Sequence, residues 1–461
     1  MKKMFRMKKV NIIAIFATVI SVFTQTGVAD TKNPMTEALK VDGAKVLLPV
    51  EAAKEPSSPK FIDAARTNFN NFHWQMGGDH SLYYNMHMSE FMPTELASPN
   101  AEYKPLAKAI NPELGKVKFK TKVKGELTLD EYVSDPQFRT QGFMLIHQGK
   151  IVYEAYPGMK PTDRHIWASA AKTTVGLVAS MLVDEGKLNP SKKITEYIPE
   201  LKGTVWDDVT VLNVLNHTTG FDNEETGESI LSPDSPVVRF FASAFGSARH
   251  STGKLESWLD VARDTQKIKG EKAGERFRYA SINTIVLTKM IQNIEGKTWT
   301  RSFEDRVWGK MTARQPALFN LTPDGMAIAV GLMQTTLEDM ARFGTLFTPS
   351  WQAVAVEPVV SDTILKRIQT SGNRKSHEGS TKQASSISSL GDMTTSQSYQ
   401  FDYVYDDGAI AKSGNLGQFI YIDPAQDFVG VVFSTNPYHS GYGESKAPAY
   451  MRAAAKMLSN K

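Results

Sequence analysis

The stretch HIWASAAKTTVGL, residues 165–177, places a serine and a lysine three positions apart at the start of an otherwise apolar run. Three residues make up nearly one helical turn, so Ser169 and Lys172 share a face if a helix runs through them. Glycine commonly ends a helix, and Gly186 follows this run. The apolar residues that continue the run at helical spacing are Val175, Val178, Ala179 and Leu182. The pattern predicts a buried helix with Lys172 in its first turn.

A lysine at this position has a specific chemical use. Burial lowers the pKa of an ammonium group, and a neutral amine beside a hydroxyl can accept the proton of Ser169. The N–H groups at the start of the helix lie next to the nucleophile and can stabilise negative charge. The alternative is that Ser169 only caps the helix and Lys172 is solvated.

The same S-x-x-K spacing occurs in residues 57–60 and 251–254. The first contains Pro59 and the second contains a glycine, so neither is expected to open a helix. We therefore assign the nucleophile to Ser169.

Residues 1–29 have the pattern of a secretory signal peptide. They contain five Lys or Arg residues and no acidic residue, and an apolar run at 10–23 that is too short to span a bilayer comfortably. Small residues at 27–29 precede a predicted cleavage site before Asp30. We expect an exported chain, periplasmic or secreted, without stable membrane insertion after cleavage; an uncleaved anchor is the alternative.

Composition excludes several classes of function. The chain of 461 residues has no cysteine, which excludes disulfides and thiolate metal sites. Its net charge is +4, and because the signal segment contributes five positive charges, the remainder has −1. Nucleic acid is therefore not an expected partner. His73, His80 and His87 are seven apart, but glycines at 77–78 interrupt a helix between them, so no metal or cofactor is predicted.

The chain is predicted to have an extension at 30–130, rich in Pro, Asn, Lys and Glu, packed on a hydrolase domain at 131–461. Within that domain, GFMLIHQGKIVYEAY at 142–156 is typical of a strand–turn–strand unit, and IYIDPAQDFVGVVFST at 420–435 of a second one. Helical patterns lie between them. The two ends should therefore pair into one antiparallel sheet, an α+β fold.

Two further segments are expected near the end of the chain. A C-terminal helix should begin at about Lys446. Residues 369–400 are polar and Ser-rich, which predicts a loop.

Further motifs follow in order along the chain: Tyr279 precedes an apolar helix, and Lys412-Ser413-Gly414 enters a strand. The order S-x-x-K, Tyr, K-S-G resembles the penicillin-recognising serine hydrolases, which include class C β-lactamases, DD-peptidases and related esterases. The resemblance covers residues 142–460. It extends to the scaffold phrases YIPEL, VTVLNVLNHTTGF and GLMQTTLEDMARFG, where His217 would occupy a structural turn.

The second motif distinguishes between branches of these serine hydrolases. Class C β-lactamases have Tyr-x-Asn, whereas here Ser281 stands at the third position of YASIN, residues 279–283. With GNLGQ at 414–418, this pattern is similar to the 6-aminohexanoate-dimer hydrolase branch, which cleaves linear amides and carboxylic esters.

The resemblance implies a serine β-lactamase-like fold, with an antiparallel sheet flanked by helices, an all-helical region, and the site in the cleft between them. In that frame Ser169 attacks the carbonyl, Lys172 accepts its proton, and Tyr279, with a pKa lowered by nearby ammonium groups, passes a proton to the leaving group. The N–H groups of Ser169 and Asn415 would form the oxyanion hole, within the strand motif that includes Gly414.

Four residues keep open roles. Lys412 would support the tyrosine or a substrate carboxylate, or else be a solvated lysine at a strand end. Ser281 and Asn283 either point into the cleft to bind substrate or cap the following helix. Gln418 is a further candidate for substrate binding.

The sequence therefore predicts an exported serine hydrolase that cleaves small-molecule esters or linear amides through an acyl-enzyme on Ser169. The alternative is a β-lactamase, or a penicillin-binding protein of the DD-peptidase type that acylates with slow or no turnover. An inactive scaffold protein is disfavoured by the intact Ser169, Lys172 and Tyr279.

Overall fold

The computed structural model describes residues 43–386, 392–437 and 446–459. The signal peptide predicted at 1–29 lies outside these residues, as does the start of the extension. No helix within the described ranges is long and apolar enough to cross a membrane.

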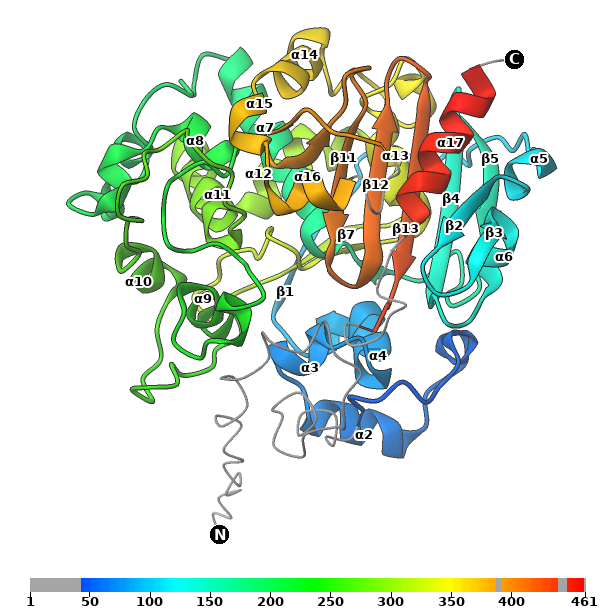
Figure 1. The fold of residues 1–461 in the computed structure, drawn as a ribbon, viewed down its shortest axis with the longest axis horizontal. Coiled ribbons are helices and arrows are strands. Elements are labelled where there is room, and N and C mark those ends of the chain that lie inside the picture. The colour runs from blue at the N-terminus through cyan, green and yellow to red at the C-terminus, as the bar shows by residue number, and fades with distance from the viewer. Residues whose placement is uncertain (1–42, 387–391, 438–445, 460–461) are drawn as a thin grey trace.

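A seven-stranded antiparallel sheet is the centre of the fold (Figure 1). Its strands, in spatial order, are β5 (Lys150–Ala155), β4 (Thr140–His147), β13 (Phe428–Ser434), β12 (Gln418–Asp423), β11 (Ile410–Gly414), β10 (Phe401–Val404) and β9 (Ser396–Ser398). Because β4 pairs with β13, the two ends of the domain meet in one sheet, which confirms the prediction from the sequence.

The predicted strand–turn–strand unit at 142–156 is the hairpin of β4 and β5. Gln148 and Gly149 both have positive φ, 49° and 69°, which is the requirement of the tight turn that matches the twist of a hairpin. The second predicted pair, β12 and β13, is also antiparallel.

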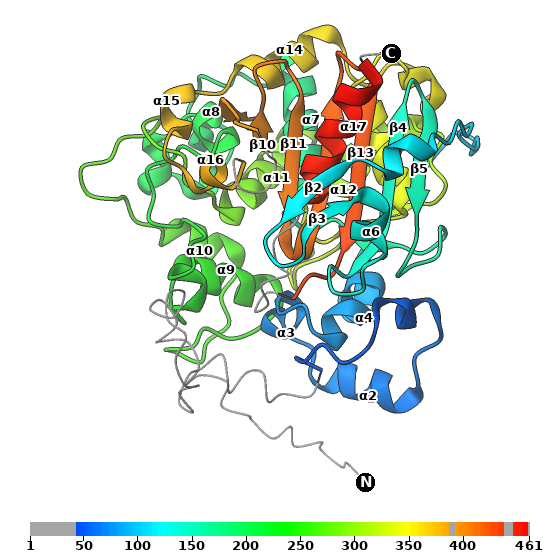
Figure 2. The same cartoon turned by 45° about the vertical axis from the view of Figure 1, so that its right-hand side comes forward.

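Side chains along β4 alternate between two cores. Met144 faces one buried cluster, whereas Phe143 and Leu145 face the other, as the period of two in a strand requires. The C-terminal helix α17 (Ala447–Ser459) packs on one face of the sheet (Figure 2), and α13 (Leu337–Thr345) packs on the other.

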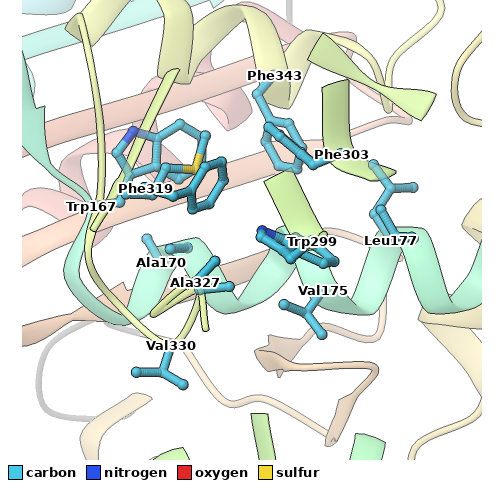
Figure 3. Packing of buried hydrophobic residues seen from close by; sticks show 14 of the residues in the cluster. Trp167, Ala170, Val175, Leu177, Trp299, Phe303, Phe319, Ala327, Val330 and Phe343 are labelled. Atoms are coloured by element: carbon cyan, nitrogen blue, oxygen red, sulfur yellow. The ribbon is translucent and has the colours of Figure 1, made fainter. Parts of the chain in front are cut away.

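A helical region lies beside the sheet, as predicted, on the side of β11 (Figure 1). Its main helices are α7 (Lys172–Asp184), α8 (Val211–Leu215), α9 (Pro236–Ala244), α10 (Trp258–Arg263), α11 (Ser281–Glu295), α12 (Trp299–Arg306) and α14 (Asp362–Thr370). Helix α7 is buried on almost every face, and Figure 3 shows its residues Val175 and Leu177 beside Trp299. Gly186, with φ of 68°, follows the end of this helix, as the sequence indicated.

Residues from the extension fold into helices and strands of their own. These are α2 (Pro59–Thr67), α3 (Asn71–Gln75), α4 (Asp79–His87), β1 (Thr94–Ala97), α5 (Pro112–Gly115), β2 (Lys118–Thr121), β3 (Gly125–Thr128) and α6 (Leu129–Ser134). Strand β1 joins a second sheet in the order β1, β7 (Ala317–Asn320), β8 (Met333–Thr335), β6 (His165–Ile166). The boundary at 130 stays a prediction.

Two expectations from the sequence were wrong. Residues 57–60 do open a helix, α2, because Ser58 caps it and Pro59 occupies its first position, where a proline needs no N–H donor. Residues 369–400 are not only a loop. They include α15 (Arg374–His377), α16 (Thr381–Ser385) and β9, which completes the sheet.

Candidate active site

A cavity of about 760 Å³ lies between the helical region and the sheet, and Ser169 is in its wall. Its size is within the range of small-molecule sites, roughly 300–1,000 Å³. Tyr279 and Glu225 line it from the helical region, and Ser413 and Gly414 line it from β11. The structure therefore brings the three sequence motifs to one cavity.

The backbone before Ser169 is held in a strained turn. Ala168 has φ of 45°, in the left-handed region that costs a non-glycine residue about 1–3 kcal/mol. The preceding Trp167 fixes the turn, because its indole N–H donates to the hydroxyl of Thr335 at 2.7 Å. Residues Ala168–Ala171 then form a short 3₁₀ helix that leads into α7.

Gly414 lets strand β11 approach this turn. A Cβ atom at Gly414 would lie 2.6 Å from the carbonyl oxygen of Trp167 and 3.1 Å from the Cβ of Ala168. Only glycine fits at such a distance, so a side chain here would push the strand away from Ser169.

Lys172 is completely buried and its Nζ contacts three oxygen atoms. It donates to the hydroxyl oxygens of Ser169 and Ser281, each at 3.0 Å, and to the carbonyl oxygen of Val330 at 2.6 Å. Burial lowers the pKa of Lys172 to about 7. The solvated-lysine alternative is therefore wrong, and a large fraction of this amine is neutral at neutral pH.

The ring of Tyr279 is surrounded by ammonium groups. The Nζ atoms of Lys412, Lys382 and Lys172 lie 4.6, 4.8 and 5.2 Å from the ring centroid. Its hydroxyl has no hydrogen-bond partner of ordinary geometry within the described part of the chain.

The prediction of a lowered tyrosine pKa was wrong. Burial raises the pKa of Tyr279 well above its usual value, the carboxylates of Asp402 and Glu225 raise it further, and the proximity of Ser169 lowers it only in part. The sequence motifs indicated two of the cations, Lys172 and Lys412, but did not include these carboxylates. Tyr279 is thus a neutral phenol at rest.

Lys412 is buried in an ion pair, not solvated at a strand end. Its Nζ lies 2.5 Å from Asp402 of β10, and Lys382 of α16 contacts the other oxygen of the same carboxylate at 2.7 Å. Burial lowers the pKa of Lys412 to about 8. For Lys382 burial also acts to lower the pKa, but Asp402, Tyr403 and Glu225 together outweigh it and the pKa is raised.

Sequence reasoning missed Asp402, Lys382 and Glu225. Asp402 stands in the apolar strand FDYV, and a carboxylate in such a strand is a signal of a buried partner. Lys382 lies in the Ser-rich segment, where nothing in the pattern distinguishes it. Glu225 accepts a hydrogen bond from the backbone N–H of Ser281.

Of the remaining candidate residues, some line the cavity and one does not. Ser281 lines the cavity with its hydroxyl against Lys172. Asn283 lies outside the cavity lining, completely buried, with its amide 3.3 Å from the ring of His217. Asn415 and Gln418 both line the cavity, but both N–H groups of the Gln418 amide are used, on the carbonyl oxygens of Asn415 and Ser434.

The arrangement supports acyl transfer. A hydroxyl, a buried amine that can accept its proton and a neutral phenol that can donate one meet at the wall of an open cavity. Burial of Lys172 gives it the pKa that a base needs near neutral pH.

The chain matches the model of the Beta-lactamase family over residues 127–455. A 6-aminohexanoate-dimer hydrolase of Paenarthrobacter ureafaciens is 27% identical over 301 residues, which is 65% of this chain and 73% of that protein.

Among solved structures, a Bacillus anthracis protein provisionally assigned as a 6-aminohexanoate-dimer hydrolase has a TM-score of 0.67 and 22% identity, over 82% of this chain and 94% of that one. EstCE1, a hydrolase with promiscuous acyltransferase activity, has a TM-score of 0.50 and 16% identity, over 71% and 96%. At these identities the two structures show the fold. Because the family model spans most of the chain and includes all three motifs, the chain belongs to the Beta-lactamase family and is a serine hydrolase of that fold.

Proposed function

We propose that this chain cleaves carboxylic esters or linear amides of small molecules through an acyl-enzyme on Ser169. The observation that carries the proposal is the hydrogen bond of 3.0 Å between Ser169 and a buried Lys172 whose pKa is about 7. Such a pair deprotonates the serine during attack without needing a histidine.

The reaction would proceed in two halves. Lys172 accepts the hydroxyl proton as Ser169 Oγ bonds to the carbonyl carbon, and the backbone N–H groups of Ser169 and Asn415 are our candidates for the oxyanion donors. Tyr279 gives its proton to the departing oxygen or nitrogen and recovers one from Lys172. Water then attacks the ester on Ser169, and the acid is released with the serine restored.

The surroundings of Ser281 favour esters and linear amides over β-lactams. Ser281 stands where class C β-lactamases have an asparagine, and its hydroxyl, which accepts a hydrogen bond from Lys172, is shorter than that amide, so it should reach the side-chain carbonyl of a β-lactam less well. The similarity to the Paenarthrobacter protein, described as a 6-aminohexanoate-dimer hydrolase, points the same way. A β-lactamase or a penicillin-binding protein that turns over slowly is the rival.

One preparation tests the proposal against this rival. The kcat/KM for p-nitrophenyl acetate should exceed that for a chromogenic cephalosporin by at least about tenfold, since a weakened hydrogen bond to the β-lactam side chain costs about 1–3 kcal/mol, or roughly 5- to 150-fold in rate. Ser169→Ala should lose both turnover and labelling by a fluorophosphonate, and Ser251→Ala, a matched serine in another S-x-x-K, should keep both. Efficient cephalosporin hydrolysis with negligible esterase activity would reverse the assignment.

We also propose that the protein is exported after cleavage near Asp30. The charged start, short apolar run and small residues of 1–29 support this. N-terminal sequencing of the protein from the periplasm or medium should begin at or close to Asp30; a cytoplasmic chain that retains Met1 would refute it.

A further inference from the structure

Part of the active-site wall comes from the extension, outside the residues that match the family model. Helix α3 ends at Gln75, and Trp74 and Gln75 both line the cavity that contains Ser169. The amide of Asn415 donates to Gln75 Oε1 at 3.4 Å. The extension therefore touches the same turn that we assign to the oxyanion hole.

Trp74 is held rigidly in this wall. It is only 5% exposed, and its indole N–H donates to Asn85 at 2.9 Å. Asn85 in turn donates to Thr435, just after β13, at 2.9 Å. A Cβ at Gly77 would lie 2.4 Å from the carbonyl oxygen of Asn436, so the backbones of the extension and the sheet are in direct contact.

The wall that Trp74 joins is apolar. Its ring stacks on Phe245, which follows α9, with centroids 5.9 Å apart. Phe241 and Ile230 also line the cavity. These three residues are partly exposed, so apolar surface is available to a ligand.

Other segments contribute both polar and apolar side chains to the lining, Ile328, Val330 and Leu332 among the apolar ones. Thr381, Lys382 and Ser385 of α16, together with Ser413 of β11, present hydroxyl and ammonium groups to the cavity. A substrate with one polar and one apolar part would match such a cavity, and an entirely polar one would leave the aromatic residues hydrated.

We propose that α3 and the end of α9 form an apolar subsite that binds an uncharged alkyl or aryl acyl group, so that the extension sets the acyl specificity of the enzyme. This inference rests on the proposed function, because the acyl group is the one transferred to Ser169. Gln75 lies at the edge of the subsite, where it contacts Asn415. Within the subsite the ring of Phe245 stacks on that of Trp74.

The test compares p-nitrophenyl acetate with p-nitrophenyl hexanoate, which share a leaving group. The wild-type chain should prefer hexanoate in kcat/KM, because the longer chain buries more apolar surface. Phe245→Ala and Gln75→Glu should each lower the hexanoate-to-acetate ratio at least about fivefold, the first by removing contact area and the second by placing a charge beside the alkyl chain. The exposed controls Leu255→Ala and Gln266→Glu should leave the ratio within about twofold of the wild type.

Different results would contradict the proposed hydrolase function and the proposed acyl subsite. If the wild type hydrolyses neither ester, the proposed function fails, and inactivation rates with ethyl and hexyl fluorophosphonates still give the chain-length comparison. The subsite is overturned if the wild type does not prefer hexanoate to acetate, or if Phe245→Ala and Gln75→Glu melt like the wild type yet keep its ratio. Gln75→Glu keeps the side-chain volume, so its hexanoate-to-acetate ratio tests the subsite even if Phe245→Ala does not fold.

Discussion

At the residue scale, Lys172 makes the reaction depend on pH. The base is the neutral amine, which predominates above the pKa of about 7 and is protonated below it. We expect kcat/KM for p-nitrophenyl acetate to rise about tenfold per unit up to about pH 7 and then level off. Lys172→Arg, which stays charged, should lose this rise along with most of the activity. A profile that falls as pH increases towards 7 would contradict the role of Lys172 as base.

The hydroxyl of Tyr279 should contribute to catalysis but not to the stability of the fold. Its buried hydroxyl has no partner of ordinary geometry within the described part of the chain, so removing that oxygen costs the fold no hydrogen bond. Tyr279→Phe should therefore lower kcat by about 10²–10⁴-fold, the usual contribution of a general acid, while the melting temperature stays the same or rises. Steady-state kinetics and calorimetry on one sample check both. Loss of stability with activity retained would show a structural role instead.

At the scale of elements, the ladder of β10 and β11 depends on one carboxylate. Asp402 is 1% exposed and pairs with both Lys382 and Lys412, which hold its pKa far below the usual range. Asp402→Ala leaves buried ammonium groups uncompensated and should cost about 3–5 kcal/mol in the free energy of unfolding.

Asp406 provides a matched control for this substitution. Its pair with Arg374 is exposed, at 79% and 66%, and Asp406→Ala should cost at most about 1 kcal/mol. Urea unfolding measures both variants, and similar costs would contradict a buried ionic role for Asp402.

Elements whose apolar residues recur at a regular period could be predicted from the sequence. Elements held in place by contacts with segments far away in the sequence could not. The alternation in β4 and β5 and the helical spacing after Lys172 depend on local sequence, and both were found. The segment 369–400 has little apolar periodicity, so nothing local indicated that β9 pairs with β10 or that α16 carries Lys382 to Tyr279. The tyrosine pKa was missed for the same reason, since the burial of Tyr279 and the carboxylate of Asp402 both depend on segments far from it in sequence.

At the scale of the whole molecule, the family resemblance located the site but said nothing of the extension. Residues 43–110 have short apolar runs that give a weak helical signal, and they fold because other parts of the chain cover them. Tyr84 and Met88 are completely buried in the main core, and β1 pairs with β7 across more than 200 residues of sequence. The extension is therefore part of the hydrolase fold as the structure shows it.

This integration predicts how truncation acts. A chain that begins at Asn111 keeps the residues matched by the family model but loses β1, which leaves β7 as an unpaired edge, and loses buried side chains that include Trp74, Tyr84 and Met88. Each of these contributes about 1.5–3 kcal/mol, so their sum is comparable with the whole stability of a typical domain, about 5–15 kcal/mol. We expect the chain from Asn111 to aggregate or to unfold without a cooperative transition, whereas a chain from Gly43 should keep the wild-type urea midpoint and esterase activity. Circular dichroism during urea unfolding distinguishes the two, and a soluble chain from Asn111 with the midpoint of the longer one would show that the extension is an independent appendage.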